Sequence, residues 1–258
     1  MQKNRNEPNP SSARPAPRAS GRRVAEAALI VFAKAPVPGQ VKTRLCPPLT
    51  PDEAASLHGS FVLDALERSR VLNKVDRFLA CDPSSDHVFF KIMEERQGVR
   101  LTDQVGQDLG AKMSHACAEA FACGYRRVLI VGSDLPTLQP SVYAHTLELL
   151  AGHDLVLGPA QDGGYYLIAL TRPLPDLFVG IPWSSDQVLT LTQRKADAMA
   201  VTMALLPPCR DVDRIEDVLA LIEEEGLDSR SVKPGASRLS KRTAGALRLI
   251  ADRLKERT

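Results

Sequence analysis

Short apolar runs alternate with longer amphipathic segments along most of this chain. The first run, residues 27–33 (AALIVFA), is apolar throughout, which predicts a central strand covered on both faces. Further strands are predicted at residues 75–81, 99–102, 127–132, 154–157, 165–170 and 201–205. Helices are predicted at residues 50–70, 84–95 and 109–122, from just after Pro140, and at 186–199 and 214–225. This alternation predicts an α/β three-layer sandwich, with a mostly parallel, Rossmann-like central sheet between helices.

The two ends of the chain differ in character from its centre. Residues 1–23 are rich in Pro, Ser, Asn and Arg and almost lack large apolar side chains, so we expect a disordered tail. Residues 24–226 are expected to form the folded domain. Residues 227–258 are expected to form a linker and a C-terminal helix, in which Leu247, Ile250 and Leu254 recur at helical spacing. That helix is basic, but packing on the domain is favoured over a nucleic-acid or membrane surface.

Composition and charge narrow the class of protein. The 258 residues carry a formal net charge of +2, which gives no general attraction to nucleic acid. No apolar run reaches the roughly 18 residues of a membrane-spanning helix, and the N-terminus lacks the apolar centre of a secretory signal. We therefore expect a cytoplasmic protein without a nucleic-acid or membrane partner, and its oligomeric state stays open. Five cysteines without metal or disulfide spacing are expected to be free thiols: Cys46, Cys81, Cys117, Cys123 and Cys209.

A cationic loop follows the first predicted strand. Its sequence, KAPVPGQVKTRL at residues 34–45, contains Lys34, Lys42 and Arg44, and two prolines with Gly39 stiffen and turn it. Clustered cations repel one another unless an anion lies among them, and lysine with arginine suits a polyphosphate chain. Ligands of parallel sheets bind beyond the carboxyl ends of the strands, where this loop begins. The pattern predicts a phosphate-binding loop, with a solvated basic loop as the alternative.

Several common catalytic motifs are absent. The cationic loop is neither a Walker loop nor a G-x-G-x-x-G dinucleotide fingerprint, which makes kinase, ATPase and NAD-dependent functions poor candidates. The sequence also lacks G-x-S-x-G and H-E-x-x-H. Without metal-ligand spacing, each histidine is expected to be structural: His58, His87, His115, His145 and His153.

Aspartates follow two later strands. Asp134, in the motif GSDLP, comes directly after the strand at 127–132, and Asp211-Val212-Asp213 follows the strand at 201–205. A carboxylate beside phosphates would repel them unless it holds a cation, so Asp134 is a natural Mg²⁺ or Mn²⁺ ligand. Asp134 could instead stabilise a turn, and Asp213 could cap the next helix. The sequence does not choose between Asp211 and Asp213 as the second ligand.

The segment GPAQDGGYY at residues 158–166 is the fourth polar motif. Its paired glycines, Gly163 and Gly164, allow close approach of a ligand, while Asp162 and two tyrosines provide hydrogen bonds and a flat surface. These features predict an acceptor or sugar pocket. A hairpin turn between two strands is the alternative, and such a turn could itself line the pocket.

Together these motifs resemble the nucleotide-diphospho-sugar transferase superfamily, which has the GT-A fold. Within it they resemble the bacterial DUF2064 family of glycosyltransferase-like proteins, related to 2-phospho-lactate guanylyltransferase. The resemblance spans roughly residues 29–221. It rests on KAPxPGxVKTRL, on Gln104 followed by GQDLG, and on GSDLP, DGGYYLI, PWSS and DVD.

Site residues follow from the motifs and from this resemblance. We expect the nucleotide to be bound by Lys34, Gly39, Lys42, Arg44, Gln104 and Gly106, with the cations on its phosphates and Gln104 and Gly106 at its base. The metal, Mg²⁺ or Mn²⁺, would be held by Asp134 and Asp213. The acceptor would be bound by Asp162, Gly163, Gly164 and Trp183. Lys42, Arg44 and Asp134 are the expected catalytic residues.

Two reactions fit these motifs. In nucleotidyl transfer, an acceptor phosphate attacks a nucleoside triphosphate and pyrophosphate leaves; in glycosyl transfer, a nucleotide-sugar loses its nucleoside diphosphate. Both depend on positioning and on charge neutralisation by metal, lysine and arginine. The cations of the first loop favour nucleotidyl transfer to a small phosphorylated acceptor, because three of them exceed what a diphosphate needs. A nucleotide-binding module without catalysis is the third hypothesis.

Overall fold

The computed structural model describes residues 25–227 and 238–255. The predicted tail at residues 1–23 and most of the predicted linker lie outside the described residues. The strands are β1 (Ala27–Lys34), β2 (Val75–Asp82), β3 (Arg100–Asp103), β4 (Arg127–Gly132), β5 (Leu155–Pro159), β6 (Tyr165–Leu170) and β7 (Met203–Leu205). The α-helices are α1 (Pro51–Arg68), α2 (Val88–Gln97), α3 (Leu109–Ala122), α4 (Ser141–Leu149), α5 (Val188–Ala198), α6 (Ile215–Glu224) and α7 (Lys241–Lys255).

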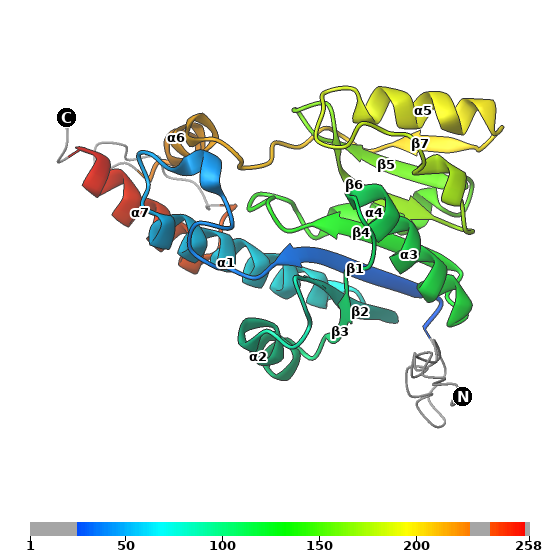
Figure 1. The fold of residues 1–258 in the computed structure, drawn as a ribbon, viewed down its shortest axis with the longest axis horizontal. Helices are drawn as coiled ribbons and strands as arrows, with labels where there is room; N and C mark the ends of the chain where they lie inside the picture. The colour runs from blue at the N-terminus through cyan, green and yellow to red at the C-terminus, as the bar shows by residue number, and fades with distance from the viewer. Residues whose placement is uncertain (1–24, 228–237, 256–258) are drawn as a thin grey trace, which may run out of the picture.

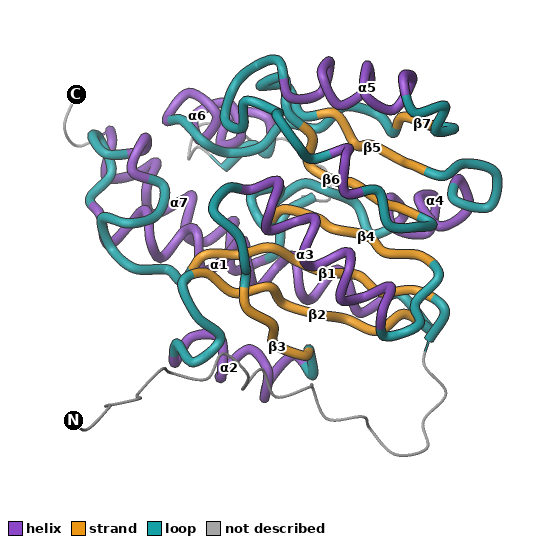
Figure 2. Tube along the Cα trace, turned by 45° about the vertical axis from the view of Figure 1, so that its right-hand side comes forward, coloured by secondary structure: helices purple, strands orange, loops and turns teal. Residues whose placement is uncertain are grey.

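All of these strands lie in one sheet, in the order β3-β2-β1-β4-β6-β5-β7 (Figures 1 and 2). The neighbours of β1 are parallel to it, with Phe32 opposite Ala80 on β2 and Gly132 on β4. Strand β6 alone runs antiparallel to both of its neighbours, because it returns from β5 through a hairpin. The predicted mostly parallel sandwich is therefore confirmed, and the parallel strands β1 and β4 end at the same edge of the sheet.

Alternating residues of β1 enter two separate hydrophobic cores. Leu29 and Val31 pack with α1, α2 and α4 on one face, whereas Ile30 and Phe32 pack with α3 and α5 on the other. A strand buried on both faces needs a continuous apolar run, which is why its sequence shows no polar alternation. Seven of the eight residues of β1 are buried, and Lys34 at its carboxyl end is exposed.

Helix α1 starts as its sequence predicts. The Thr50 hydroxyl accepts a hydrogen bond from the backbone N–H of Glu53 at 3.2 Å, and the Glu53 carboxylate accepts one from the N–H of Thr50 at 2.7 Å. This capping box with Pro51 at the first helical position satisfies backbone donors that a helix N-terminus otherwise leaves free. Buried residues of α1 also form part of a third hydrophobic core.

That third core joins α1 to α6 and α7 beyond the end of the sheet (Figure 1). Leu247 and Ile250 of α7 are buried in it, so the amphipathic C-terminal helix packs on the domain as expected. Asp64 of α1, 1% exposed, lies at the same contact and accepts hydrogen bonds from α7 and from Ser240 just before it. Within residues 25–227 and 238–255, no helix is long and apolar enough to cross a membrane.

Candidate functional site

The cationic loop leaves the carboxyl end of β1 and leads to a short helix. Lys42 has φ 50° and ψ 36°, a left-handed conformation, and precedes the short 3-10 helix Thr43–Leu45. Non-glycine residues adopt this conformation only where their surroundings hold it. Leu45 is fully buried in the third core and anchors the far end of the loop. The loop therefore places the Lys42 side chain beside Asp134, which follows β4.

The Lys42 ammonium lies between two carboxylates that the sequence separates widely. Its Nζ is 2.8 Å from Asp134 Oδ2 and 2.8 Å from Asp213 Oδ1, and the Lys42 side chain is 5% exposed. Burial alone would lower the pKa of Lys42, but the two carboxylates outweigh it and raise that pKa. Burial would likewise raise the pKa of Asp134, but Lys42 and His58 hold it well below its usual range. Lys42 and Asp134 are therefore both charged at neutral pH.

The remaining oxygens of the two carboxylates also face basic groups. His58 Nδ1 on α1 lies 3.3 Å from Asp134 Oδ1, and Arg44 Nη1 lies 3.6 Å from Asp213 Oδ2. His58 is buried, and its Nε2 is 3.0 Å from the carbonyl oxygen of Lys34. The sequence analysis missed His58 as a site residue. The one sequence feature that marks His58 is that a titratable side chain occurs in a helix segment that is otherwise largely apolar.

The structure separates Asp211 from Asp213. The carboxylate of Asp213 faces Lys42 and does not cap α6; instead Asp217 Oδ2 accepts hydrogen bonds from the backbone N–H groups of Asp213 at 3.0 Å and Arg214 at 2.7 Å. Asp211 lines a neighbouring cavity, where burial together with Asp162 and Asp213 raises its pKa to about 6. Asp213 is thus the partner of Asp134.

A basic cavity of about 360 Å³ opens at the ends of β1 and β4. Its polar lining comes from Lys34, Gln40, Lys42, Thr43, Arg44, His58, Gln104, Ser133, Asp134 and Asp213. Gln104 is fixed across the strand ends because its Nε2 donates to the carbonyls of Ala33 at 3.2 Å and Ala80 at 2.9 Å. Gly39 and Gly106, which we expected at the nucleotide, line neither this cavity nor the next one.

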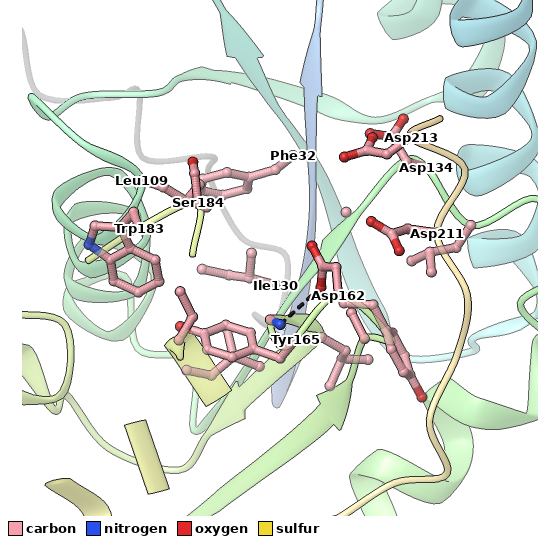
Figure 3. A pocket seen from close by; sticks show the side chains of 18 of the residues that line it. Phe32, Leu109, Ile130, Asp134, Asp162, Tyr165, Trp183, Ser184, Asp211 and Asp213 are labelled. Atoms are coloured by element: carbon pink, nitrogen blue, oxygen red, sulfur yellow. Dashed lines mark hydrogen bonds between the residues drawn. The ribbon is translucent and has the colours of Figure 1, made fainter. Parts of the chain in front are cut away.

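An aromatic cavity of about 420 Å³ adjoins the basic one. Figure 3 shows Asp134, Asp211 and Asp213 on one side of this cavity and Trp183 on the opposite side, with Tyr165 between them. Both cavities share a wall formed by Phe32, Arg44, Leu109, Gly132, Asp134 and Asp213. The carboxylate pair therefore lies where a ligand in one cavity would meet a ligand in the other.

The hairpin between β5 and β6 supplies part of the aromatic cavity, so the turn predicted there also lines a pocket. Asp162 Oδ1 accepts a hydrogen bond from the N–H of Gly164 at 2.9 Å, and both residues line the cavity. Gly163 faces the backbone of Asp186 instead of the cavity. It has φ +89°, and a Cβ on it would lie 2.6 Å from the backbone carbonyl carbon of Asp186. Gly163 therefore shapes the hairpin and is not part of the lining.

Trp183 forms the wall opposite the carboxylates. Its ring meets Tyr165 edge to face, with ring centroids 6.3 Å apart and planes at 87°. The indole lies against Gly110 of α3, where a Cβ would stand 2.5 Å from Nε1, so only glycine leaves room for it. Within the described residues, Trp183 Nε1 is buried without a hydrogen-bond partner. Gly110 is a second residue that the sequence analysis did not place at the site.

The donors present fit a divalent cation that also binds phosphate. Asp134 and Asp213 converge on one positive charge, and their oxygens are the hard ligands that Mg²⁺ and Mn²⁺ prefer. No group of three or more His, Cys, Asp or Glu in the described ranges could hold a metal ion. Two carboxylates nevertheless suffice for Mg²⁺, which commonly keeps waters and substrate phosphates as its other ligands.

A Rossmann-like sheet with a basic cavity and a carboxylate pair at its strand ends defines a nucleotide-transferase class of fold. Residues 65–185 match the family described as uncharacterized protein conserved in bacteria, DUF2064. A provisionally named nucleotide-diphospho-sugar transferase of Desulfovibrio desulfuricans G20 is 31% identical, with a TM-score of 0.77, over 90% of this chain and 98% of that protein. The chain therefore belongs to the family of nucleotide-diphospho-sugar transferase-like proteins, and its residues 65–185 carry the DUF2064 match.

Two further relatives are more distant. The 2-phospho-L-lactate guanylyltransferase of Methanothermobacter thermautotrophicus is 29% identical over 136 residues, which span 51% of this chain and only 56% of that enzyme. The 4-diphosphocytidyl-2C-methyl-D-erythritol synthase of Anaerococcus prevotii is 11% identical, with a TM-score of 0.51, over 77% of this chain and 97% of that protein. The second likeness shows the fold alone.

Proposed function

We propose that this protein is a metal-dependent transferase that binds a nucleotide in the basic cavity and passes a group to an acceptor in the aromatic cavity. The observation that carries this proposal is the position of Asp134 and Asp213 in the wall that both cavities share. A cation held there would lie beside the phosphates of the donor and close to the attacking group of the acceptor. The names of the relatives support the same class of reaction.

On the donor side, the chain supplies charge and position. Lys34 and Arg44 are exposed in the basic cavity and would bind the phosphates, while Gln104, fixed between strand ends, would face the base. Asp134 and Asp213 would hold Mg²⁺ or Mn²⁺. When bound, the metal would neutralise the negative charge that develops on the leaving phosphate. Positioning and charge stabilisation of this kind need no protein nucleophile.

The acceptor side favours glycosyl transfer over nucleotidyl transfer. Its polar lining holds four aspartates, Asp134, Asp162, Asp211 and Asp213, against the single cation Arg44. Even with two of these carboxylates neutralised by a cation, a phosphorylated acceptor would meet Asp162 and Asp211 with only Arg44, which also lines the donor cavity, to bind its phosphate. A neutral hydroxyl acceptor would instead hydrogen-bond to these carboxylates and stack on Tyr165 and Trp183.

In this reaction the acceptor oxygen forms a bond to the anomeric carbon of the sugar, and the bond from that carbon to the β-phosphate oxygen breaks. The nucleoside diphosphate leaves with the electron pair of that bond. Asp162 or Asp211 would accept the proton that the acceptor hydroxyl loses. Nucleotidyl transfer to a phosphorylated acceptor is the second candidate, and the three cations of the loop that follows β1 support it.

Product analysis distinguishes the two reactions. The protein is incubated with Mn²⁺ and either nucleotide-sugars or the four nucleoside triphosphates, each with mixed polyol, sugar and sugar-phosphate acceptors. We expect release of a nucleoside diphosphate that is lost in Asp134→Asn. Release of pyrophosphate that requires a phosphorylated acceptor would establish the second candidate instead. Tight nucleotide binding without any product would show a binding module and contradict both.

A further inference from the structure

The positive charge of Lys42 is already neutralised by carboxylates of the protein itself. Its ammonium is 2.8 Å from Asp134 Oδ2 and from Asp213 Oδ1, and its side chain is 5% exposed. Lys34 and Arg44, by contrast, are exposed in the same cavity. Lys42 is therefore not a preformed phosphate ligand of the same kind as the other two cations.

Every oxygen of the two carboxylates lies close to a nitrogen of a basic side chain. Beside the two contacts to Lys42, His58 lies 3.3 Å from Asp134 Oδ1 and Arg44 lies 3.6 Å from Asp213 Oδ2. A divalent cation that bridges the pair must displace at least one of these groups. Lys42 is the group between both carboxylates, so a bridging metal would compete with its ammonium directly.

We propose that Lys42 and a divalent cation exclude one another at the Asp134–Asp213 pair, and that a nucleotide polyphosphate admits the metal by drawing the Lys42 ammonium away from the carboxylates and onto the phosphates. This inference rests on the proposed function, since it assigns the metal to that pair. It makes Lys42 a positioning residue that couples metal binding to nucleotide binding.

Charge balance supports this exchange. The two carboxylates, the Lys42 ammonium and the Arg44 guanidinium already sum to 0. A divalent metal added beside the ammonium would bring the sum to +2, whereas a metal in place of the ammonium brings it to +1, which an additional anion can offset. The phosphates of a nucleotide provide that anion, so Lys42 can leave the carboxylates for them. Because coupling is reciprocal, the metal should also strengthen polyphosphate binding.

Metal binding without nucleotide tests the exchange. Free Mn²⁺ is measured by electron paramagnetic resonance while the full-length protein is titrated, as wild type and as Lys42→Gln. We expect Lys42→Gln to bind Mn²⁺ alone about tenfold more tightly, within the usual range of coupling between sites. Lys112→Met is the matched control, because Lys112 pairs with Asp82 at 3.1 Å and lines neither cavity. Its Mn²⁺ affinity should equal that of the wild type.

Inorganic pyrophosphate then serves as the polyphosphate probe. After correction for the Mn²⁺–pyrophosphate complex measured without protein, pyrophosphate should raise the Mn²⁺ affinity of the wild type more than that of Lys42→Gln. The double variant Lys42→Gln with Asp213→Asn should lose the tighter Mn²⁺ binding of Lys42→Gln alone. That loss would locate the tighter binding at the carboxylate pair. Melting curves check folding, and Lys42→Met replaces Lys42→Gln if the latter does not fold.

The other outcomes separate the exchange from the function on which it rests. Equal or weaker Mn²⁺ binding by Lys42→Gln would overturn the exchange and leave the metal site in place. Absence of Mn²⁺ binding in every variant, with and without pyrophosphate, would overturn the metal site itself and with it the proposed metal-dependent reaction.

Discussion

The buried carboxylate of Asp64 is expected to hold the C-terminal helix on the domain. Asp64, 1% exposed on α1, accepts hydrogen bonds from Ser240 Oγ at 2.8 Å, Thr243 Oγ1 at 2.6 Å and Arg242 Nη1 at 2.7 Å. Asp64→Asn keeps the size of the side chain but removes its charge and one acceptor oxygen. Two hydroxyl donors and one guanidinium donor would then compete for a single neutral acceptor.

The magnitude follows from these contacts. Hydrogen bonds to a charged group contribute about 1.5–3 kcal/mol each, but Arg242 is 37% exposed and can turn to water. We therefore expect a loss of about 3 kcal/mol in the free energy of unfolding, near the lower limit for breaking a buried ion pair. For a domain of this size, that loss lowers the melting temperature by roughly 6–12 °C.

The same arginine provides the matched control. Glu67, 40% exposed, accepts from Arg242 Nη2 at 2.8 Å, and a surface pair of this kind contributes about 0–1 kcal/mol. Urea unfolding followed by circular dichroism should therefore show a large loss for Asp64→Asn and a small one for Glu67→Gln. Equal losses for the two variants would refute the reasoning that burial makes the difference.

Three further variants test the site and the environment of the thiols. Gly110→Ala should displace Trp183, the only tryptophan of the chain, shifting its fluorescence to longer wavelength and weakening acceptor binding; an unchanged spectrum would mean that the indole does not depend on this contact. Lys34→Ala should weaken nucleotide binding about tenfold, measured by calorimetry, while the melting temperature without ligand stays the same because Lys34 is exposed. At pH 8, an alkylating reagent should label the exposed Cys123 within minutes and leave Cys81 unlabelled in mass spectra, because burial raises the pKa of the Cys81 thiol to about 12. Faster labelling of Cys81 would contradict its burial.

Sequence patterns predicted the elements best where local chemistry is strong. The apolar run of β1 and the capping box of Thr50 and Glu53 act within a few residues, so both are readable without the fold. Helix α2 was predicted four residues early, from residue 84 instead of Val88, because the His87 side chain provides the cap by accepting from the N–H of Phe89. Histidine is an uncommon N-cap residue, so the sequence did not mark this start.

The site was predictable where one motif carries its own chemistry and not where distant segments meet. Strand-end position predicted that Asp134 would lie near the cationic loop, but only the fold shows that Asp213, rather than Asp211, shares Lys42 with it. The contacts of His58 with Asp134 and of Gly110 with Trp183 join segments far apart in the chain, so no local pattern reveals them.

The dependence of nucleotide binding on the carboxylate pair tests the central claim most directly. The melting temperatures of the wild type and Asp213→Asn are compared with nucleoside triphosphates and nucleotide-sugars, with and without Mn²⁺. Ligands that bind only the folded state raise the melting temperature. We predict that at least one nucleotide stabilises the wild type in the presence of Mn²⁺, and that Asp213→Asn loses this stabilisation. Equal stabilisation of both proteins, or stabilisation by no nucleotide at all, would contradict the account.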